Sequence, residues 1–227
     1  MKEFYLTLFE GHPIIKDGDN LILIDTGSPS TIHISNSLEF CSEIYPCSTN
    51  YMGLTTNKLS EMLGTEITTL LGADIISDYE LMLDYKKKVC HFSKQNIMFE
   101  GQECEISSFM GIPVIELAID NKILKLFLDT GAKLSYLPQN ITKAFESVGI
   151  EEDFYPGVGK FKTDCYELPT RFEKNDFMVK YGNLPPMLES ALKLSGVEGI
   201  IGYDFFNNFK VSLGKENKTM NYVRQTI

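Results

Sequence analysis

The chain has few basic residues and no long apolar segment. Its 227 residues include 21 Lys and Arg against 31 Asp and Glu, which gives a formal net charge of −10. Nucleic acids and anionic membranes are bound through clustered basic side chains, so this balance argues against both as partners. No apolar run approaches the length of a membrane span, and Glu3 and Glu10 interrupt the N-terminal segment where a signal peptide needs an apolar core. We therefore expect neither secretion nor a membrane partner.

Paired cysteines and metal-ligand spacings are missing as well. The five cysteines are an odd number without a Cys-x-x-Cys pair, and the three histidines are isolated from one another. Such a set is typical neither of a zinc site nor of a disulfide framework, and it favours a reducing compartment. We expect a cytoplasmic protein with no metal and no other cofactor.

Two common enzyme motifs are also absent. A Gly-x-Ser-x-Gly elbow does not occur, so a serine hydrolase lacks support. The segment Gly157–Lys160 contains two glycines and a lysine but lacks the spacing of a phosphate-binding loop. Neither acyl transfer through serine nor nucleotide binding is indicated.

The tripeptide Asp-Thr-Gly, in contrast, occurs twice. It follows the apolar run Leu21–Ile24 at residues 25–27, and the apolar run Leu126–Leu128 at residues 129–131. From average residue usage, one chance copy in a chain of this length has a probability of roughly a few per cent, and two copies in the same context are far less probable. We interpret Asp25 and Asp129 as facing each other.

A second motif follows each tripeptide in the same order. Two apolar residues and a glycine occur at Leu70–Gly72, 47 residues after Asp25, and at Ile200–Gly202, 73 residues after Asp129. The repeat therefore covers whole lobes, and the second lobe carries about 26 residues that the first lacks. We expect an N-terminal lobe at residues 1–100 and a C-terminal lobe at residues 108–227, joined by the polar stretch 93–108.

Both lobes have mainly the pattern of strands. Apolar residues alternate or run continuously at 21–24, 31–34, 112–119 and 122–128, as in half-buried and buried strands. Short helices are predicted at 56–63, capped by Thr56 and ended by Gly64, and also at 141–147 and 187–194. The predicted fold class is all-β and bilobal, with a few short helices.

These motifs resemble those of aspartic proteases of the pepsin and retropepsin kind. The chain is much shorter than a pepsin and looks like two retropepsin-sized lobes fused in one chain. The resemblance implies a bilobal acid-protease fold, a peptide or protein substrate, and Asp25 and Asp129 as the catalytic pair. It implies that Thr26 and Thr130 each reach across to the opposite loop. It also implies that Gly27 and Gly131 let the two backbones approach closely and offer N–H donors to the carboxylates. Gly72 and Gly202 would pack under their own aspartate loops.

The chemistry of two adjacent carboxyl groups agrees with that role. Two carboxylates close together cannot both ionise readily, so the pair holds one shared proton. The ionised member can take a proton from a bridging water while the protonated member donates to the scissile carbonyl. This hydrolysis of a peptide bond requires neither a metal nor a covalent intermediate.

The residue after each glycine differs between the two loops. Ser28 carries a hydroxyl that can donate to a carboxylate and favour its ionised form, whereas Ala132 cannot. We hypothesise that Asp25 is the more readily ionised member of the pair.

A flap over the site is predicted from the second lobe alone. Tyr155–Phe161 resembles a glycine-tipped flap hairpin, with Gly157, Val158 and Gly159 at its tip, although an ordinary surface hairpin would have the same pattern. In the first lobe, the segment that lies about as far after Asp25 as the flap segment lies after Asp129 is Cys47–Gly53. This segment is too short for a full hairpin. Tyr155 or Tyr166 would take the place of the flap tyrosine of pepsins, and no motif decides between them.

The leading hypothesis is a monomeric aspartic endopeptidase. A peptide-binding module with this fold and little catalysis is the alternative, because the short first lobe could weaken the exclusion of water. A glycosidase with two carboxylates would leave the paired Thr-Gly unexplained.

Overall fold

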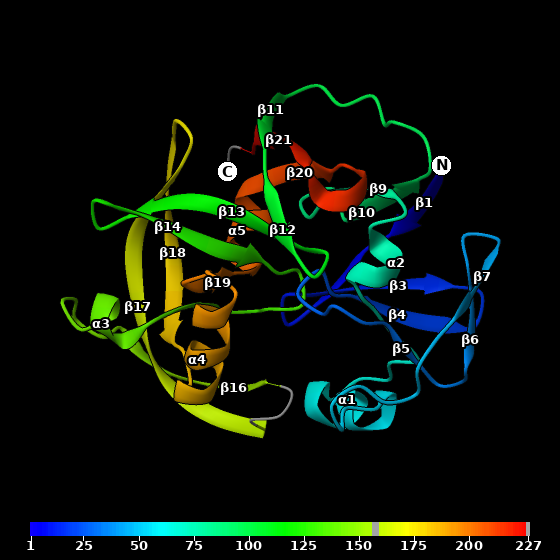
Figure 1. The fold of residues 1–227 in the computed structure, drawn as a ribbon, viewed down its shortest axis with the longest axis horizontal. Helices are drawn as coiled ribbons and strands as arrows, with labels where there is room; N and C mark the ends of the chain where they lie inside the picture. Colours follow the sequence, from blue (N-terminus) through cyan, green and yellow to red (C-terminus); the bar gives the residue numbers. More distant parts are fainter. Residues whose placement is uncertain (156–158, 226–227) are drawn as a thin grey trace.

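The computed structural model describes residues 1–155 and 159–225 of the chain. Strands from the two halves of the sequence lie on opposite sides of the molecule, and the helices between them are short (Figure 1). The predicted all-β, two-lobed fold class is confirmed. No helix in the described ranges is long and apolar enough to cross a membrane.

The first half contains a five-stranded sheet that carries Asp25 at its centre. Its order is β2 (Thr7–Phe9), β3 (His12–Asp17), β4 (Asn20–Ile24), β8 (Thr69–Leu71) and β5 (Ile32–His33). The last three residues of β4 are buried and apolar, which fixes the strand that ends at Asp25. Strand β8, from the second motif, pairs parallel to β4 with Leu71 opposite Ile24.

The second half repeats this order and then extends it. Its eight-stranded sheet runs β12 (Ser107–Phe109), β13 (Ile112–Ile119), β14 (Lys122–Leu128), β19 (Gly199–Ile201), β15 (Ser135–Leu137), β18 (Asn175–Asn183), β17 (Gly159–Phe172) and β16 (Gly149–Tyr155). The first five strands match the five of the first half one for one, and β14 pairs parallel to β19. The sequence insertion therefore forms an extension of the sheet made of β18, β17 and β16.

A six-stranded sheet joins the two halves. Its order is β1 (Lys2–Tyr5), β10 (Val89–Ser93), β9 (Glu80–Asp84), β20 (Phe209–Leu213), β21 (Thr219–Arg224) and β11 (Gln102–Glu105). The halves meet where β9 pairs with β20, with Leu83 opposite Val211. Strand β11 lies in the stretch expected to be a linker, so that stretch contributes to a sheet. A separate hairpin of the first half consists of β6 (Ser37–Phe40) and β7 (Glu43–Pro46).

The helices agree only partly with the sequence prediction. They are α1 (Thr56–Leu63), α2 (Ala73–Ile76), α3 (Gln139–Thr142), α4 (Pro186–Leu194), α5 (Tyr203–Asn208) and the 3-10 turn η1 (Lys215–Asn217). Helix α1 has the predicted range and ends at Gly64, where φ is +74°, but its cap is Thr55, whose side chain accepts from the N–H of Lys58. The helix predicted at 141–147 is wrong, because the chain turns after Thr142 and Phe145 N–H bonds the Thr142 carbonyl.

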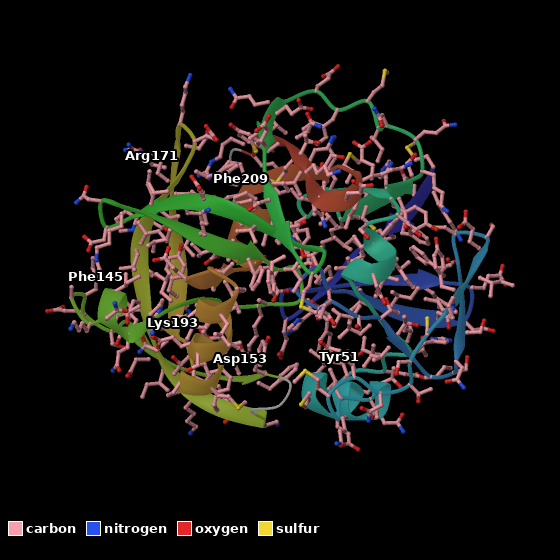
Figure 2. All side chains as sticks on the ribbon, viewed as in Figure 1. Tyr51, Phe145, Asp153, Arg171, Lys193 and Phe209 are labelled. Carbon is pink, nitrogen blue, oxygen red and sulfur yellow. The ribbon has the colours of Figure 1, made fainter. Side chains whose placement is uncertain are left out.

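An aromatic cluster connects the eight-stranded and six-stranded sheets, and its member Phe209 of β20 is labelled in Figure 2. The rings of Phe172, Phe205 and Phe209 lie within 4.8–5.6 Å of one another, and Phe205, Phe206 and Phe209 are fully buried. Aromatic pairs at such distances add to the free energy of burial. The cluster packs α5, the helix that follows the second glycine motif, against the core.

Candidate active site

Each Asp-Thr-Gly tripeptide begins where its apolar strand ends. The N–H of Asp25 donates to the carbonyl of Leu71 at 3.0 Å, and the N–H of Asp129 donates to the carbonyl of Ile201 at 2.9 Å. The first residue of each loop is thus fixed by the second motif of the same half. The two aspartates occupy equivalent places in two equivalent sheets.

The two threonines connect the loops across the molecule. The hydroxyl of Thr26 accepts from the N–H of Thr130, and the hydroxyl of Thr130 accepts from the N–H of Thr26, both at 3.0 Å. Each hydroxyl also donates across the interface at 2.7 Å, Thr26 to the Leu128 carbonyl and Thr130 to the Ile24 carbonyl. Both side chains are buried. The loops are therefore held in one reciprocal network.

The two glycines bring each backbone against the opposite carboxyl group. A Cβ atom placed on Gly27 would lie 2.2 Å from Cγ of Asp129, and one placed on Gly131 would lie 2.6 Å from Cγ of Asp25. Gly27 N–H donates to Oδ1 of Asp25 at 3.0 Å, and Gly131 N–H to Oδ1 of Asp129 at 2.8 Å. Any side chain at either position would displace a carboxyl group, so the two carboxyl groups share one narrow space.

Burial and mutual repulsion favour a shared proton. Burial raises the pKa of Asp25 well above its usual range, and the negative charge of Asp129 raises it further. Burial raises the pKa of Asp129 to about 6, against the lowering effect of a hydrogen bond from Gly131 and one from Asp25. Because the two groups interact, the proton belongs to the pair.

The asymmetry expected from Ser28 is wrong. Its hydroxyl donates to the carbonyl of Ser30 at 2.9 Å and not to the carboxylate of Asp25. A serine side chain readily bonds a backbone group two residues away, and that local bond competes with the longer reach to the carboxyl group. Ala132 has no hydroxyl, so neither loop supplies a side-chain donor from this position.

The glycine of each second motif packs under its aspartate loop. A Cβ atom on Gly72 would lie 2.6 Å from the backbone of Ser30, and one on Gly202 would lie 2.2 Å from the carbonyl oxygen of Ala132. Two hydroxyl side chains accept from these glycines: Thr31 Oγ1 from Gly72 N–H at 2.9 Å and Ser135 Oγ from Gly202 N–H at 3.1 Å.

Thr31 and Ser135 were missed from the sequence. The available signal was a hydroxyl residue six positions after each aspartate. Asp74 also bonds Thr31, whose N–H and hydroxyl donate to it at 2.9 Å and 2.6 Å. Asp74 therefore acts as a structural hydrogen-bond acceptor.

The segment predicted as a flap lies on the β16–β17 hairpin. Tyr155 is the last residue of β16 and pairs with Gly159, the first of β17. Gly157 and Val158 lie outside the described residues. Tyr155 lines the cavity that contains both aspartates, whereas Tyr166 is buried in the main core.

The cavity around the aspartates is small and lies between the two halves. Its volume is about 60 Å³. One wall is apolar and comes from the first half: Leu23, Leu54, Leu59 and Leu70. The second half contributes Ile200, Phe154 and Tyr155, and the polar residues at the edge are His12, Lys133 and Asp153.

The three polar residues at this edge were not predicted as site residues. His12, one of the three histidines that are isolated in the sequence, is 4% exposed, and its Nδ1 has no hydrogen-bond partner among the described residues. Lys133 and Asp153 belong to segments 20 residues apart that meet only in the folded chain. No spacing in the sequence indicates that these three side chains come together.

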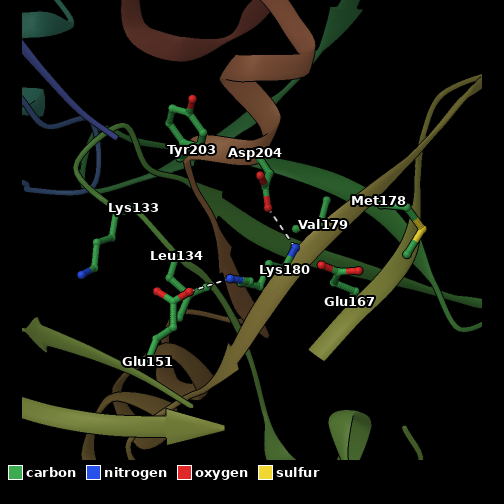
Figure 3. Close-up of a pocket in the computed structure, with 9 residues that line it drawn as sticks. All are labelled: Lys133, Leu134, Glu151, Glu167, Met178, Val179, Lys180, Tyr203 and Asp204. Carbon is green, nitrogen blue, oxygen red and sulfur yellow. Dashed lines mark hydrogen bonds and ion pairs between the residues drawn. The ribbon is translucent and has the colours of Figure 1, made fainter. Parts of the chain in front are cut away.

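A larger hollow of about 300 Å³ lies on the second half beside Lys133 (Figure 3). Its charged groups largely satisfy one another. Lys180 Nζ pairs with Glu151 at 2.5 Å, and the N–H of Lys180 donates to Asp204 at 2.8 Å. Neither Asp25 nor Asp129 lines it. In residues 1–155 and 159–225, no group of three or more His, Cys, Asp or Glu side chains is placed to hold a metal ion.

The chain matches no protein-family model and no curated protein sequence. Among solved structures similar to it is the solution structure of Simian Foamy Virus (mac) protease, 14% identical with a TM-score of 0.31 over 40% of this chain and 88% of that one. Another is a retropepsin-like aspartic protease from Rickettsia conorii, 15% identical with a TM-score of 0.40 over 58% of this chain and 99% of that one. The chain resembles retropepsin-like aspartic proteases. At these TM-scores the likeness is loose, and what bears on chemistry is the geometry around the two aspartates.

Proposed function

We propose that the chain is an aspartic endopeptidase in which Asp25 and Asp129 act as a catalytic dyad. The observation that carries this proposal is the packing of each tripeptide glycine against the opposite aspartate, with the two threonines bonded across. Two half-buried carboxyl groups that share one space in a cavity favour a functional role, because each perturbs the ionisation of the other.

The proposed reaction uses one water and one shared proton. The ionised member of the pair takes a proton from the water, which attacks the scissile carbonyl carbon. The protonated member donates a hydrogen bond to the carbonyl oxygen as negative charge develops there. The N–H groups of Gly27 and Gly131 hold the carboxyl groups in place throughout. Breakdown of the tetrahedral intermediate transfers a proton to the leaving nitrogen.

The proposed substrate is an extended segment of a peptide or protein. The cavity that contains both aspartates is lined by both halves of the chain, and a peptide segment bound there would contact both. Both aspartates come from one chain, which supports a monomeric enzyme. All five cysteines are free, which fits a reducing compartment such as the cytoplasm.

A peptide-binding module with little catalysis is the second candidate. It is favoured by the shorter first half: in the described part of the chain, its β6–β7 hairpin contributes no residue to the lining of the cavity. A less completely covered site excludes water less well, and exclusion of water strengthens the electrostatic interactions that catalysis uses.

Cleavage and binding measured together separate the two candidates. A peptide library is incubated with the wild type at pH 3 to 8, and binding of the same peptides is measured for the Asp25→Asn variant. The enzyme is expected to cleave a subset of peptides that the variant binds intact. Binding by both proteins without cleavage at any pH would favour the module.

A further inference from the structure

Asp153, on strand β16, is a buried carboxyl group with three partners. Its side chain is 6% exposed. The hydroxyl of Tyr136 donates to Oδ2, and the N–H of Phe154 donates to Oδ1 at 2.8 Å. Nζ of Lys133 lies 3.9 Å from Oδ1. A carboxylate taken out of water is tolerated only when it is paired in this way, so Asp153 has a strongly preferred position.

Two of these partners belong to the segment that carries Asp129. Lys133 lies two residues after the second Asp-Thr-Gly, and Tyr136 lies on β15 three residues later. Lys133 also donates to the carbonyl of Glu152 at 3.0 Å. Burial raises the pKa of the Tyr136 hydroxyl, as does the charge of Asp153, so that hydroxyl stays protonated as the donor. The segment that carries Asp129 thus holds β16 through contacts at two consecutive residues, Glu152 and Asp153.

The residues that follow Asp153 contact the rest of the cavity. Phe154 packs against the apolar cluster of the first half, and its ring centre lies 6.3 Å from that of His12. Tyr155 lines the cavity beside Asp25 and Asp129. Because neighbouring residues of a strand move together, a shift of Asp153 moves Tyr155 relative to the aspartates.

We propose that Asp153 is a positioning residue that holds strand β16, and with it Tyr155, beside the two aspartates through Tyr136 and Lys133. The kinetic consequence rests on the proposed endopeptidase function, whereas the consequence for the hairpin does not. The position of Tyr155 is then set by the segment that also carries Asp129. This one segment therefore fixes how Tyr155 lies relative to the two aspartates.

The test compares three variants with a matched control. Asp153→Ala removes every side-chain contact, Asp153→Asn keeps an acceptor for Tyr136 but loses the charge, and Tyr136→Phe removes the donor. The control Asp176→Asn neutralises an aspartate that pairs with Arg171 at 2.6 Å on the β17–β18 turn. Asp176 is 68% exposed, and Arg171 lies far from Asp153 (Figure 2).

Amide hydrogen exchange of β16 is the first measurement, and it needs no activity. Asp153→Ala and Tyr136→Phe are expected to exchange at least about tenfold faster at residues 150–155, with the six-stranded sheet unchanged and Asp153→Asn intermediate. Unchanged exchange in β16, or equal acceleration throughout the protein, would overturn the proposal. If Asp153→Ala does not fold, Asp153→Asn and Tyr136→Phe decide the question.

Steady-state kinetics are the second measurement. Asp153→Ala is expected to lower kcat/KM about 10- to 100-fold, Asp153→Asn to recover part of the loss, and Asp176→Asn to match the wild type. Wild-type kinetics in Asp153→Ala would contradict the positioning role. A wild type that cleaves no peptide would refute the endopeptidase function, while the exchange measurement would still decide the role of Asp153.

Discussion

Thr26 and Thr130 bond each other's backbone reciprocally, each hydroxyl accepting from the other's N–H at 3.0 Å. The same hydroxyls donate at 2.7 Å to the strand that precedes the opposite aspartate. All four bonds are buried and cross between the halves. The separation of the two aspartates is therefore fixed by side chains adjacent to them in the sequence.

Replacing either threonine with valine should destabilise the fold. Thr26→Val keeps the shape but leaves the Thr130 N–H and the Leu128 carbonyl buried without a partner, at a cost of about 2–5 kcal/mol. Thr26→Ser retains the hydroxyl and should lose about 1 kcal/mol or less. Urea unfolding measures both, and a valine variant as stable as the serine variant would show that the network contributes little.

The dyad should make the protein less stable as the pH rises. Burial raises the pKa of both carboxyl groups, that of Asp129 to about 6, so between about pH 4 and 6 the folded chain binds more protons than the unfolded chain. Stability is then lost as the pH rises through that window. The Asp129→Asn variant lacks one of these two titrating carboxyl groups. Its free energy of unfolding, relative to that of the wild type, should therefore improve by about 2–3 kcal/mol from pH 4 to pH 7. Urea unfolding at the two pH values tests this, and a constant difference would contradict it.

His12 should act in the opposite direction. Its burial lowers its pKa, which the charge of Asp153 only partly offsets, so below about pH 6.5 the folded chain binds fewer protons than the unfolded chain. The stability that this group contributes is present above that pH and is lost as the pH falls through the folded pKa. The His12→Gln variant should lose less stability than the wild type between pH 7.5 and pH 5. Equal losses in the two proteins would show that His12 is readily protonated in place.

Much of the fold could be predicted from the repeat of two motifs. Each tripeptide and each glycine motif marks one end of a parallel strand pair, so the five-strand unit around Asp25 recurs around Asp129. The six-stranded sheet could not be predicted, because β9 and β20 pair across about 130 residues and their sequences carry no signal for each other. Helices α2 and α5 are too short to show a period.

The polar residues around the cavity could not be predicted from the sequence either. His12, Lys133 and Asp153 come from three segments, and only the folded chain brings them to one cavity. The role expected of Ser28 failed for a local reason, since the carbonyl of Ser30 accepts its hydroxyl. Sequence patterns predicted the aspartates, threonines and glycines of the repeat. They missed the repeated hydroxyl residues Thr31 and Ser135, and they missed the contacts between segments that have no counterpart in the other half.

Tyr155 and Tyr166 offer a matched test of the hairpin. Tyr155 lines the cavity that contains both aspartates, whereas Tyr166 is buried in the main core, where its hydroxyl accepts from Nδ2 of Asn183 at 3.5 Å. Tyr155→Phe should lower kcat/KM about tenfold, because a hydroxyl is removed beside the reacting groups. Tyr166→Phe should leave it unchanged. The reverse pattern, measured by steady-state kinetics on one peptide, would assign the flap tyrosine to Tyr166.

The most direct test of the dyad is the hydrolysis rate of one peptide that the wild type cleaves. The rate is measured for Asp25→Asn and Asp129→Asn, with Asp176→Asn as the control for loss of an aspartate elsewhere. Each dyad variant should lose at least about 10³-fold in kcat, because the remaining carboxyl group cannot both activate water and donate to the carbonyl. The control should match the wild type. A dyad variant that retains kcat within about tenfold of the wild type would contradict the proposed mechanism.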